Sequence, residues 1–498
     1  MFKREAGILL PITALPSPYG IGCFSKEAYR FVDYLRAAGQ RAWQLLPLGP
    51  TGYGDSPYQS FSSYAGNPYL ISLETLIEKG YLTKEDCATA ALEGNPERVD
   101  YGVMYERRLP LLRLAYSRCA ERETREREAF AEKNQGWLGD YALFMAIKSR
   151  LGGKPLGEWD RSIRMRDPET LARFRRELAE EIDFQIFLQY EFFTAWHRLK
   201  AYANERGLRL IGDLPIYVSA DSADVWTDPH LFQLDGAGNP LAVAGCPPDG
   251  FSPEGQLWGN PLYRWEAHRQ TDYAWWISRL AHAFSLYDVV RIDHFRGFDS
   301  YYSIPFGARN AVDGHWEKGP GMELFSAVEA ALGKREVIAE DLGYMTDSVR
   351  ALVRDSGFAG MKILQFGFDP TDSRFEGEYL PHRYGENTAA YPGTHDNPTL
   401  AAWLATLSEE ERKMLRRYLW DHHTPDAELR EVLLALLMRC PSRLCIVPIQ
   451  DYLGLDDSAR INRPSTTGGN WVWRLSDGAL TPELLQRIRD LTAIGGRL

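Results

Sequence analysis

Asp288-Val-Val-Arg-Ile-Asp293-His-Phe-Arg-Gly297 is the stretch that says most about the fold. Its apolar residues at 289, 290 and 292 predict a short buried strand that ends at Asp293. Arg291 and Asp293 are two residues apart, so both side chains point to the same side of that strand. Charged residues at the carboxyl end of a buried strand are typical of the active-site face of a (β/α)8 barrel.

Seven further apolar runs are spread along the chain, and most of them also end in a polar or charged cluster. Stretches with helical periodicity separate them, and this alternation predicts a parallel α/β sheet. With the strand at 289–292 they predict a (β/α)8 TIM barrel, a single catalytic unit over residues 1–498. The seven runs are 7–10, 42–46, 208–211, 337–339, 363–367, 389–391 and 445–447.

The uneven spacing of these strands predicts inserted subdomains. About 160 residues separate the second and third strands, far more than one crossover needs. Much of this interval has helical periodicity, so residues 76–165 are predicted to form a helical insertion. Residues 220–275 are rich in Gly, Pro, Asp and Trp and are expected to be irregular, a substrate-loop insertion beside the barrel mouth. After residue 447 there is room for loops and a final helix, but hardly for a C-terminal β-sandwich domain.

The charge and the aromatic content of the chain indicate which kinds of molecule it binds. Lys and Arg total 57 and Asp and Glu total 68, which gives a net charge of −11. We do not expect such an acidic chain to bind nucleic acid or an anionic membrane, because phosphate groups attract clustered cations. The 14 Trp, 26 Tyr and 22 Phe supply rings that stack on sugars, although large cores use aromatic residues as well.

The cysteines and the apolar runs indicate the compartment. Six cysteines are scattered without a CxxC pair, which suits a reducing cytoplasm. The apolar run near residue 10 is too short for a secretory signal, and no apolar run reaches the length of a membrane span. We therefore expect a cytoplasmic location.

Two carboxylates at predicted strand ends are candidates for glycosidic chemistry. Arg291 is expected to lower the pKa of Asp293 and to hold its carboxylate in place, as a nucleophile requires. A structural salt bridge would leave the same pattern. Glu340 follows the run 337–339, and partial burial there would raise its pKa and suit a general acid. The alternative for Glu340, and the better description of Asp341, is a capping acid at a helix N-terminus.

Two more carboxylates follow other strands. Asp396, beside His395, either stabilises positive charge at the anomeric carbon or caps the next helix. Asp213 ends the third strand, as a partner of Arg291 or as a turn residue. Four carboxylates at the ends of four strands favour a catalytic site, because the alternative requires each of the four to be a solvated surface residue by coincidence. Neighbouring strands lie about 4.8 Å apart, close to the roughly 5–5.5 Å between the two carboxyl groups of a retaining glycosidase.

Longer segments carry a resemblance to one known family. They are 43–60, which contains Ser56-Pro-Tyr58, then 61–68, 251–263 with Gly255-Gln256-Leu-Trp258, the three catalytic strand ends, and 450–455, 462–465 and 469–471. In this order they resemble the 4-α-glucanotransferases of the amylomaltase type, also called disproportionating enzymes, of glycoside hydrolase family 77 in the α-amylase clan. The resemblance covers nearly the whole chain.

The resemblance implies a role for each candidate residue. Asp293 would be the nucleophile, Glu340 the acid/base and Asp396 the stabiliser of the transition state. The other site residues would bind sugar: Arg291, His294, His395 and Asp213 beside the cut bond, Ser56, Tyr58 and Asn462 on the donor side, and Gln256 and Trp258 with Phe251 in the loop on the acceptor side. No cofactor and no metal are expected, and the histidines show no ligand spacing such as HExxH.

One position departs from the family. Gly250 stands where the family usually has an aromatic residue, commonly Tyr. The missing ring removes a stacking surface, and Gly adds backbone freedom to the loop. The change either weakens acceptor binding or alters product size, unless the neighbouring Phe251 compensates.

The resemblance implies transfer of a segment of an α-1,4-glucan to the 4-hydroxyl of an acceptor glucose or glucan. The expected mechanism is a double displacement that retains the α configuration. The substrates would be malto-oligosaccharides, amylose and other α-1,4-glucans, and a chain that accepts its own end would become cyclic. Three alternatives remain open: a hydrolase on the same scaffold, a non-catalytic glucan-binding or regulatory protein, and a metal-dependent hydrolase.

Overall fold

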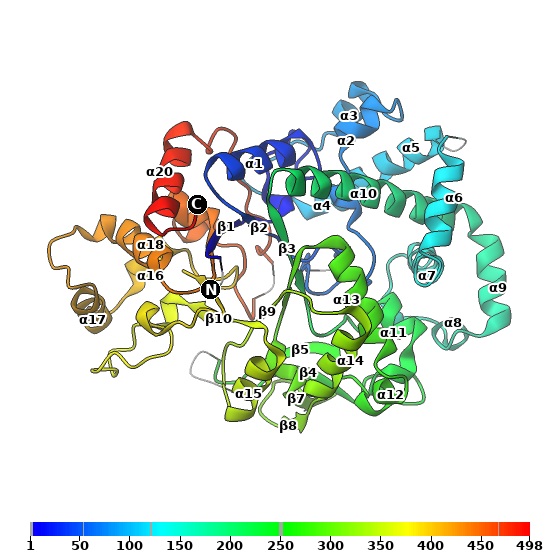
Figure 1. Cartoon of the computed structure of the whole chain (residues 1–498). Coiled ribbons are helices and arrows are strands. Elements are labelled where there is room, and N and C mark those ends of the chain that lie inside the picture. Colours follow the sequence, from blue (N-terminus) through cyan, green and yellow to red (C-terminus); the bar gives the residue numbers. More distant parts are fainter. Residues whose placement is uncertain (1–2, 53, 120–121, 249–251, 467) are drawn as a thin grey trace.

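The fold is a closed barrel of eight parallel strands, as the sequence predicts. The computed structural model describes residues 3–52, 54–119, 122–248, 252–466 and 468–498. The strands neighbour one another in the order β1, β12, β11, β10, β9, β6, β3, β2, and β1 closes the barrel against both β12 and β2 (Figure 1). The barrel strands are β1 (Glu5–Leu9), β2 (Ala42–Gln44), β3 (Arg209–Leu214), β6 (Val289–Ile292), β9 (Val337–Ala339), β10 (Ala359–Ile363), β11 (Thr388–Tyr391) and β12 (Leu444–Pro448).

The prediction for the sixth strand is wrong, whereas the other seven overlap barrel strands. The expected run 363–367 begins where β10 ends, and Leu364–Phe366 is a 3₁₀ helix. Gly360 and Lys362 interrupt the apolar pattern of β10, so local periodicity does not reveal it. A Cβ atom at Gly360 would lie 2.7 Å from the Oδ2 atom of Asp341, so a larger residue there would displace this carboxylate.

Apolar side chains fill the inside of the barrel and decide where the polar residues point. Ile211, Val289 and Ile338 belong to this inner cluster. Side chains alternate along a strand, so Arg291, two residues after Val289, also points inward. Asp293 continues the same row just beyond β6. The strand that the sequence predicts therefore delivers both charged groups to the barrel mouth.

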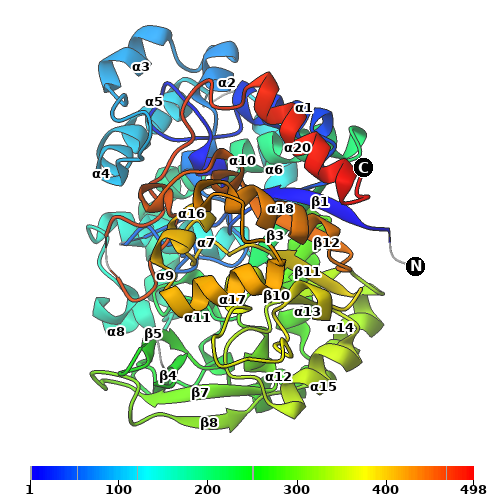
Figure 2. The ribbon, with the colours of Figure 1, turned by 90° about the vertical axis from the view of Figure 1, so that its left-hand side faces the viewer.

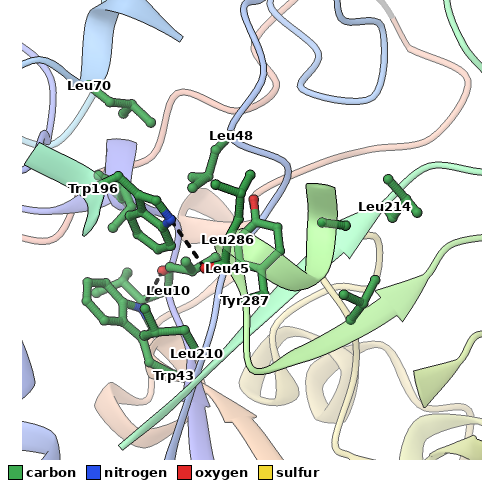
Figure 3. Close-up of a cluster of buried hydrophobic side chains, with 14 of the residues drawn as sticks. Leu10, Trp43, Leu45, Leu48, Leu70, Trp196, Leu210, Leu214, Leu286 and Tyr287 are labelled. Atoms are coloured by element: carbon green, nitrogen blue, oxygen red, sulfur yellow. Dashed lines mark hydrogen bonds between the residues drawn. The ribbon is translucent and has the colours of Figure 1, made fainter. Parts of the chain in front are cut away.

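A second apolar cluster lies between the strands and the surrounding helices (Figure 3). Trp43 of β2 and Trp196 of α10 (Ala179–Glu205) are fully buried in it. Their indole N–H groups donate to the backbone carbonyls of Leu10, at 2.8 Å, and Leu286, at 3.2 Å. Replacing a buried Trp by Ala typically costs roughly 3–5 kcal/mol, so these two rings are major supports of the barrel wall.

Between β2 and β3 the chain is mostly helical and gathers on one side of the barrel, to the right in Figure 1. Residues 76–165 include most of these helices, and the exact bounds of the insertion stay a prediction. The long α10 leads back to the barrel and packs against α7. The other helices are α2 (Leu73–Glu78), α3 (Lys84–Ala90), α4 (Tyr101–Val103), a π-helical turn (Met104–Arg108), α5 (Leu109–Cys119), α6 (Thr124–Lys133), α7 (Leu138–Arg150), α8 (Arg161–Arg164) and α9 (Pro168–Glu177).

Residues 220–275 are not irregular as expected, because they contain two strands of a second sheet. This sheet is antiparallel and has the order β5, β4, β7, β8, at the bottom of Figure 2. Its strands are β4 (Ala242–Cys246), β5 (Gln256–Pro261), β7 (Ser300–Pro305) and β8 (His315–Lys318). The prediction failed because β4 pairs with β7, which lies beyond β6 in the sequence.

The remaining helices surround the barrel, and α20 near the C-terminus packs against α1 and α18. In the described residues no helix is both long and apolar enough to cross a membrane. These helices are α1 (Lys26–Ala37), α11 (Ala223–Thr227), α12 (Trp265–Gln270), α13 (Ala274–Leu286), α14 (Met322–Leu332), α15 (Asp347–Ser356), α16 (Leu400–Thr406), α17 (Glu409–Leu419), α18 (Leu429–Arg439), α19 (Ile449–Leu453) and α20 (Pro482–Ile494).

Candidate active site

The four carboxylates singled out in the sequence lie at the carboxyl ends of four barrel strands. Asp213 lies on β3, and Asp293, Glu340 and Asp396 follow β6, β9 and β11. β6 pairs with β3 on one side and with β9 on the other. Asp293 and Glu340 therefore follow neighbouring strands, with Asp213 on the strand beyond Asp293.

Arg291 connects two of these carboxylates. Its Nη1 atom lies 2.7 Å from both carboxylate oxygens of Asp213 and 3.1 Å from the Oδ1 atom of Asp293. The Arg291 and Asp213 side chains are buried, whereas that of Asp293 remains 29% exposed. Asp213 thus neutralises and orients the guanidinium, which in turn holds an accessible Asp293.

Glu340 is fixed by the backbone of its own loop and of the loop after β6. Its Oε2 atom accepts the N–H of His294 at 2.6 Å, and Oε1 accepts the N–H of Leu342 at 3.0 Å. Burial and the charge of Asp293 raise the pKa of Glu340 well above that of an ordinary carboxyl group. Arg291 and the two N–H donors offset only part of this rise. The expectation of a proton-holding Glu340 is therefore supported by its environment.

The expected lowering of the pKa of Asp293 is wrong. Burial raises this pKa above the ordinary value, and the charge of Arg291 offsets only part of the rise. Asp213 adds to it, because a second negative charge close by disfavours ionisation. The rise is smaller for Asp293 than for Glu340. The pKa of Glu340 is therefore the higher of the two, as a proton donor beside an ionised nucleophile requires.

Tyr58 contacts both Asp213 and His395. Its hydroxyl donates to the Oδ2 atom of Asp213 at 2.8 Å, and its ring stacks on His395 with 5.2 Å between ring centroids. Burial raises the pKa of Tyr58 well above the ordinary value, so the hydroxyl stays a donor. Trp471 packs beside both rings, 5.6 Å from Tyr58 and 5.9 Å from His395.

Asp396 is positioned by the loop after β12. The side-chain amide of Asn462 donates to its Oδ1 atom at 2.6 Å, and the Asn462 N–H donates to the carbonyl of His395 at 3.1 Å. The Arg460 guanidinium also donates to the backbone carbonyl of Asp396. The Asp396 side chain is 44% exposed, so its carboxylate is accessible.

His294 and Trp258 pack on the opposite side of the barrel mouth. Their rings meet edge to face with 4.8 Å between centroids. Burial lowers the pKa of His294 to about 3, so its ring is neutral. The indole N–H of Trp258 donates to the Oε1 atom of Gln256 at 3.0 Å. The structure thus brings these three predicted residues together next to Glu340, because the His294 N–H binds its carboxylate.

Ser56 lies at the edge of this network. Its hydroxyl accepts the N–H of Tyr58 at 3.3 Å, its backbone carbonyl accepts the N–H of Gln59 at 3.1 Å, and the residue is partly exposed. Phe251, like Gly250, lies outside the described residues. In the part of the chain that is described, no group of three or more His, Cys, Asp or Glu side chains is arranged to hold a metal ion.

Two supporting residues have no role in the sequence prediction. Trp471 belongs to a segment that carries the family resemblance, yet only the fold places it against Tyr58. The sequence does not predict the role of Arg460, because this side chain binds the backbone carbonyl of Asp396, 64 residues away in the chain. The positive φ of Trp471, 63°, is itself unusual for a residue with a side chain and indicates a constrained loop.

Comparisons with known proteins show the family to which the chain is related. Residues 10–481 match the protein family that is described as 4-alpha-glucanotransferase. A 4-alpha-glucanotransferase of Streptococcus pneumoniae is 46% identical over 504 residues, covering 100% of this chain and 98% of that protein. A 4-alpha-glucanotransferase of Thermus thermophilus is 46% identical over 505 residues, covering 99% of each.

A solved structure is similar throughout. The amylomaltase of Streptococcus agalactiae, in complex with acarbose, has a TM-score of 0.96 and 43% identity, covering 99% of this chain and 100% of that one. The amylomaltase of Corynebacterium glutamicum, at 20% identity and a TM-score of 0.78, shares the fold. By the extent of these matches, the chain belongs to the 4-alpha-glucanotransferase family.

Proposed function

We propose that this 4-α-glucanotransferase moves a segment of an α-1,4-glucan to the 4-hydroxyl of an acceptor sugar through Asp293 and Glu340. One observation carries the residue assignment. Two carboxylates follow neighbouring strands, and the pKa of Glu340 is raised more than that of Asp293. Between the two pKa values, Asp293 is ionised while Glu340 holds a proton, which is the combination that a retaining mechanism needs.

In the first displacement Glu340 protonates the oxygen of the glycosidic bond while Asp293 attacks the anomeric carbon. The bond from carbon to the leaving oxygen breaks, a bond from carbon to the carboxylate forms, and the configuration inverts. The Glu340 proton leaves with the departing sugar, so Glu340 becomes a carboxylate. The charge of Asp293 is consumed in the covalent intermediate.

In the second displacement Glu340 takes the proton of an acceptor 4-hydroxyl. The acceptor oxygen attacks the anomeric carbon, Asp293 leaves as a carboxylate, and a second inversion restores the α configuration. Both residues return to their starting protonation states. Sugar and water compete for the same intermediate, so transfer depends on how well the acceptor side binds sugar and excludes water.

Asp396 is proposed to stabilise the positive charge that develops on the sugar ring. Asn462 holds one of its oxygens and leaves the other for the substrate. The buried Asp213–Arg291 pair and Tyr58 position the nucleophile, and His395 and His294 line the two sides of the sugar beside the cut bond. Ser56 and Asn462 are assigned to the donor side.

The proposed substrates are malto-oligosaccharides, amylose and other α-1,4-glucans. The acceptor side is assigned to Gln256, Trp258 and Phe251 in the substrate-loop insertion at 220–275, which belongs with the helical insertion at 76–165 to one catalytic barrel. A cytoplasmic location is supported by the low content of six scattered cysteines, none of which forms a CxxC pair. The net charge of −11 argues against nucleic acid as a partner.

Incubation with maltotriose tests transfer against hydrolysis. Transfer gives longer oligomers together with glucose while the number of reducing ends stays constant. Hydrolysis gives only shorter sugars with a matching growth of reducing ends, and that result would refute the proposal. Activity that survives exhaustive chelation would exclude the metal-dependent alternative.

The residue assignment is tested with Asp293→Asn. Turnover should fall by several orders of magnitude, since loss of a catalytic carboxylate removes the covalent route. The thermal unfolding midpoint should stay within a few degrees, because Arg291 keeps its contacts with Asp213. Substantial remaining transfer activity would show that Asp293 is not the nucleophile.

A further inference from the structure

We propose that Trp316 and Tyr344 form an outer acceptor subsite that binds the distal sugars of long glucan acceptors. The inference rests on the proposed function, because it assumes that Glu340 activates an acceptor hydroxyl. Trp316 lies on β8, and Tyr344 lies in the loop after β9, four residues beyond Glu340. Both side chains are exposed aromatic rings without a part in the catalytic network described above.

A buried arginine joins these two residues to each other. The guanidinium carbon of Arg296 lies 3.8 Å from the ring centroid of Trp316. The same guanidinium donates to the backbone carbonyl of Tyr344, and its Nη2 atom donates to the hydroxyl of Ser300 at 3.1 Å. Arg296 is only 3% exposed, so it is a fixed base rather than a mobile surface chain.

The indole of Trp316 is therefore held in one orientation with part of its surface open. Arg296 covers one face, and the ring of Tyr302 meets the indole at a steep angle, 5.1 Å between centroids. Even so, 37% of Trp316 and 69% of Tyr344 remain exposed. A rigid, partly open aromatic ring matches the apolar face of a glucose unit, which stacks on such rings.

The location connects this pair to the reacting atoms. Arg296 is three residues after Asp293, and Tyr344 is four residues after Glu340, so the hydrogen bond from Arg296 to the Tyr344 carbonyl joins the two strand-end loops that carry the chemistry. Trp316 lies on β8, the edge strand opposite β5, which carries Gln256 and Trp258 of the acceptor side, and three strand spacings of about 4.8 Å separate the two edges. An acceptor of several sugars is long enough to span this sheet from Trp258 to Trp316, whereas glucose is not.

The test compares acceptors of two lengths. Amylose serves as donor, and isotope-labelled glucose or isotope-labelled maltohexaose serves as acceptor. Trp316→Ala should lower the ratio of kcat/KM for maltohexaose over glucose roughly two- to tenfold, the range expected for one lost stacking contact. Tyr344→Ala should lower the ratio in the same direction, and Trp316→Phe, which keeps a ring, should retain most of it.

Trp420→Ala is the matched control. Trp420 is an even more exposed tryptophan, at 84%, on the C-terminal cap of α17, and its loss should leave the ratio unchanged. If both acceptors lose kcat/KM equally, Trp316 only supports the loop of Glu340 and the inference is overturned. An unchanged ratio in both Trp316→Ala and Tyr344→Ala also overturns it.

Failure of the proposed function would look different from failure of this inference. If the wild-type protein does not extend labelled glucose at all, transfer itself is absent. If it extends glucose normally while the variants keep the wild-type ratio, only the outer subsite is refuted. Should Trp316→Ala fail to fold, Tyr344→Ala decides, since the exposed ring can be removed without touching the backbone carbonyl that binds Arg296.

Discussion

At the scale of single residues, the site separates two carboxylates by their surroundings. Asp293 has a guanidinium at 3.1 Å, whereas Glu340 has only backbone N–H donors and faces the charge of Asp293. Each additional pKa unit corresponds to about 1.4 kcal/mol of difference between the protonation states. Carboxyl groups of similar intrinsic acidity can thus supply both a nucleophile and a proton donor.

These surroundings predict a bell-shaped pH dependence of kcat/KM. The acid limb reports protonation of Asp293, and the alkaline limb reports loss of the proton from Glu340. Burial raises the pKa of both groups, so both limbs should lie above the ordinary carboxyl value of about 4. Transfer rates measured across the pH range check this. An alkaline limb at the ordinary carboxyl pKa would contradict it.

Tyr58→Phe separates the hydroxyl from the ring. The stacking on His395 remains, while the donor to Asp213 is lost. We expect a loss of stability of about 1 kcal/mol and a fall in kcat of roughly tenfold, because Asp213 holds Arg291 less firmly. Urea unfolding and transfer assays measure the two effects. A variant with wild-type kcat would show that the hydroxyl has no positioning role.

At the scale of elements, a buried carboxylate connects two of the loops that build the site. Asp451 on α19 is 2% exposed, and its Oδ1 atom accepts the N–H of Leu400, the first residue of α16, at 2.7 Å. α16 follows the loop of Asp396, and α19 precedes the loop of Asn462. Burial raises the pKa of Asp451 to about 7.

Asp451→Asn should therefore stabilise the protein above neutral pH. The pKa of Asp451 is higher in the folded state than in the unfolded state, so ionisation of Asp451 destabilises the folded protein. The free energy of unfolding therefore falls as the pH rises from about 4 through 7. Asn keeps the acceptor for Leu400 but does not ionise. The free energy of unfolding should exceed that of the wild type by about 1–2 kcal/mol at pH 8, and by less at pH 5. A larger gain at pH 5 would contradict the argument.

At the scale of the whole molecule, one arginine near the C-terminus holds the closure of the barrel. Arg497 is fully buried, and its guanidinium donates to backbone carbonyls of Glu5 at 3.0 Å and of Ser442 at 2.9 Å. It also donates to the carbonyls of Met438 and Cys440 at the end of α18. These contacts connect the beginnings of β1 and β12, the strands that close the barrel.

Arg497→Met keeps the apolar stem and removes every donor. We expect a loss of about 3 kcal/mol in the free energy of unfolding, because buried carbonyls remain without partners. Arg489→Met on the preceding helix α20 is the control, since Arg489 is exposed and donates one backbone hydrogen bond, to the carbonyl of Ala37. Equal losses in the two variants by calorimetry would argue against a special role for Arg497.

The barrel class, the four strand-end carboxylates and the family can be predicted from local patterns: apolar runs, the two-residue period of a strand, and motifs in a fixed order. The raised pKa of Asp293, the sheet that pairs β4 with β7 and the position of β10 become visible only in the folded chain. The physical reason is that desolvation and strand pairing are made by residues far apart in the chain. Asp213 and Arg291 are 78 positions apart, yet after burial their two charges act most strongly on the pKa of Asp293, in opposite directions.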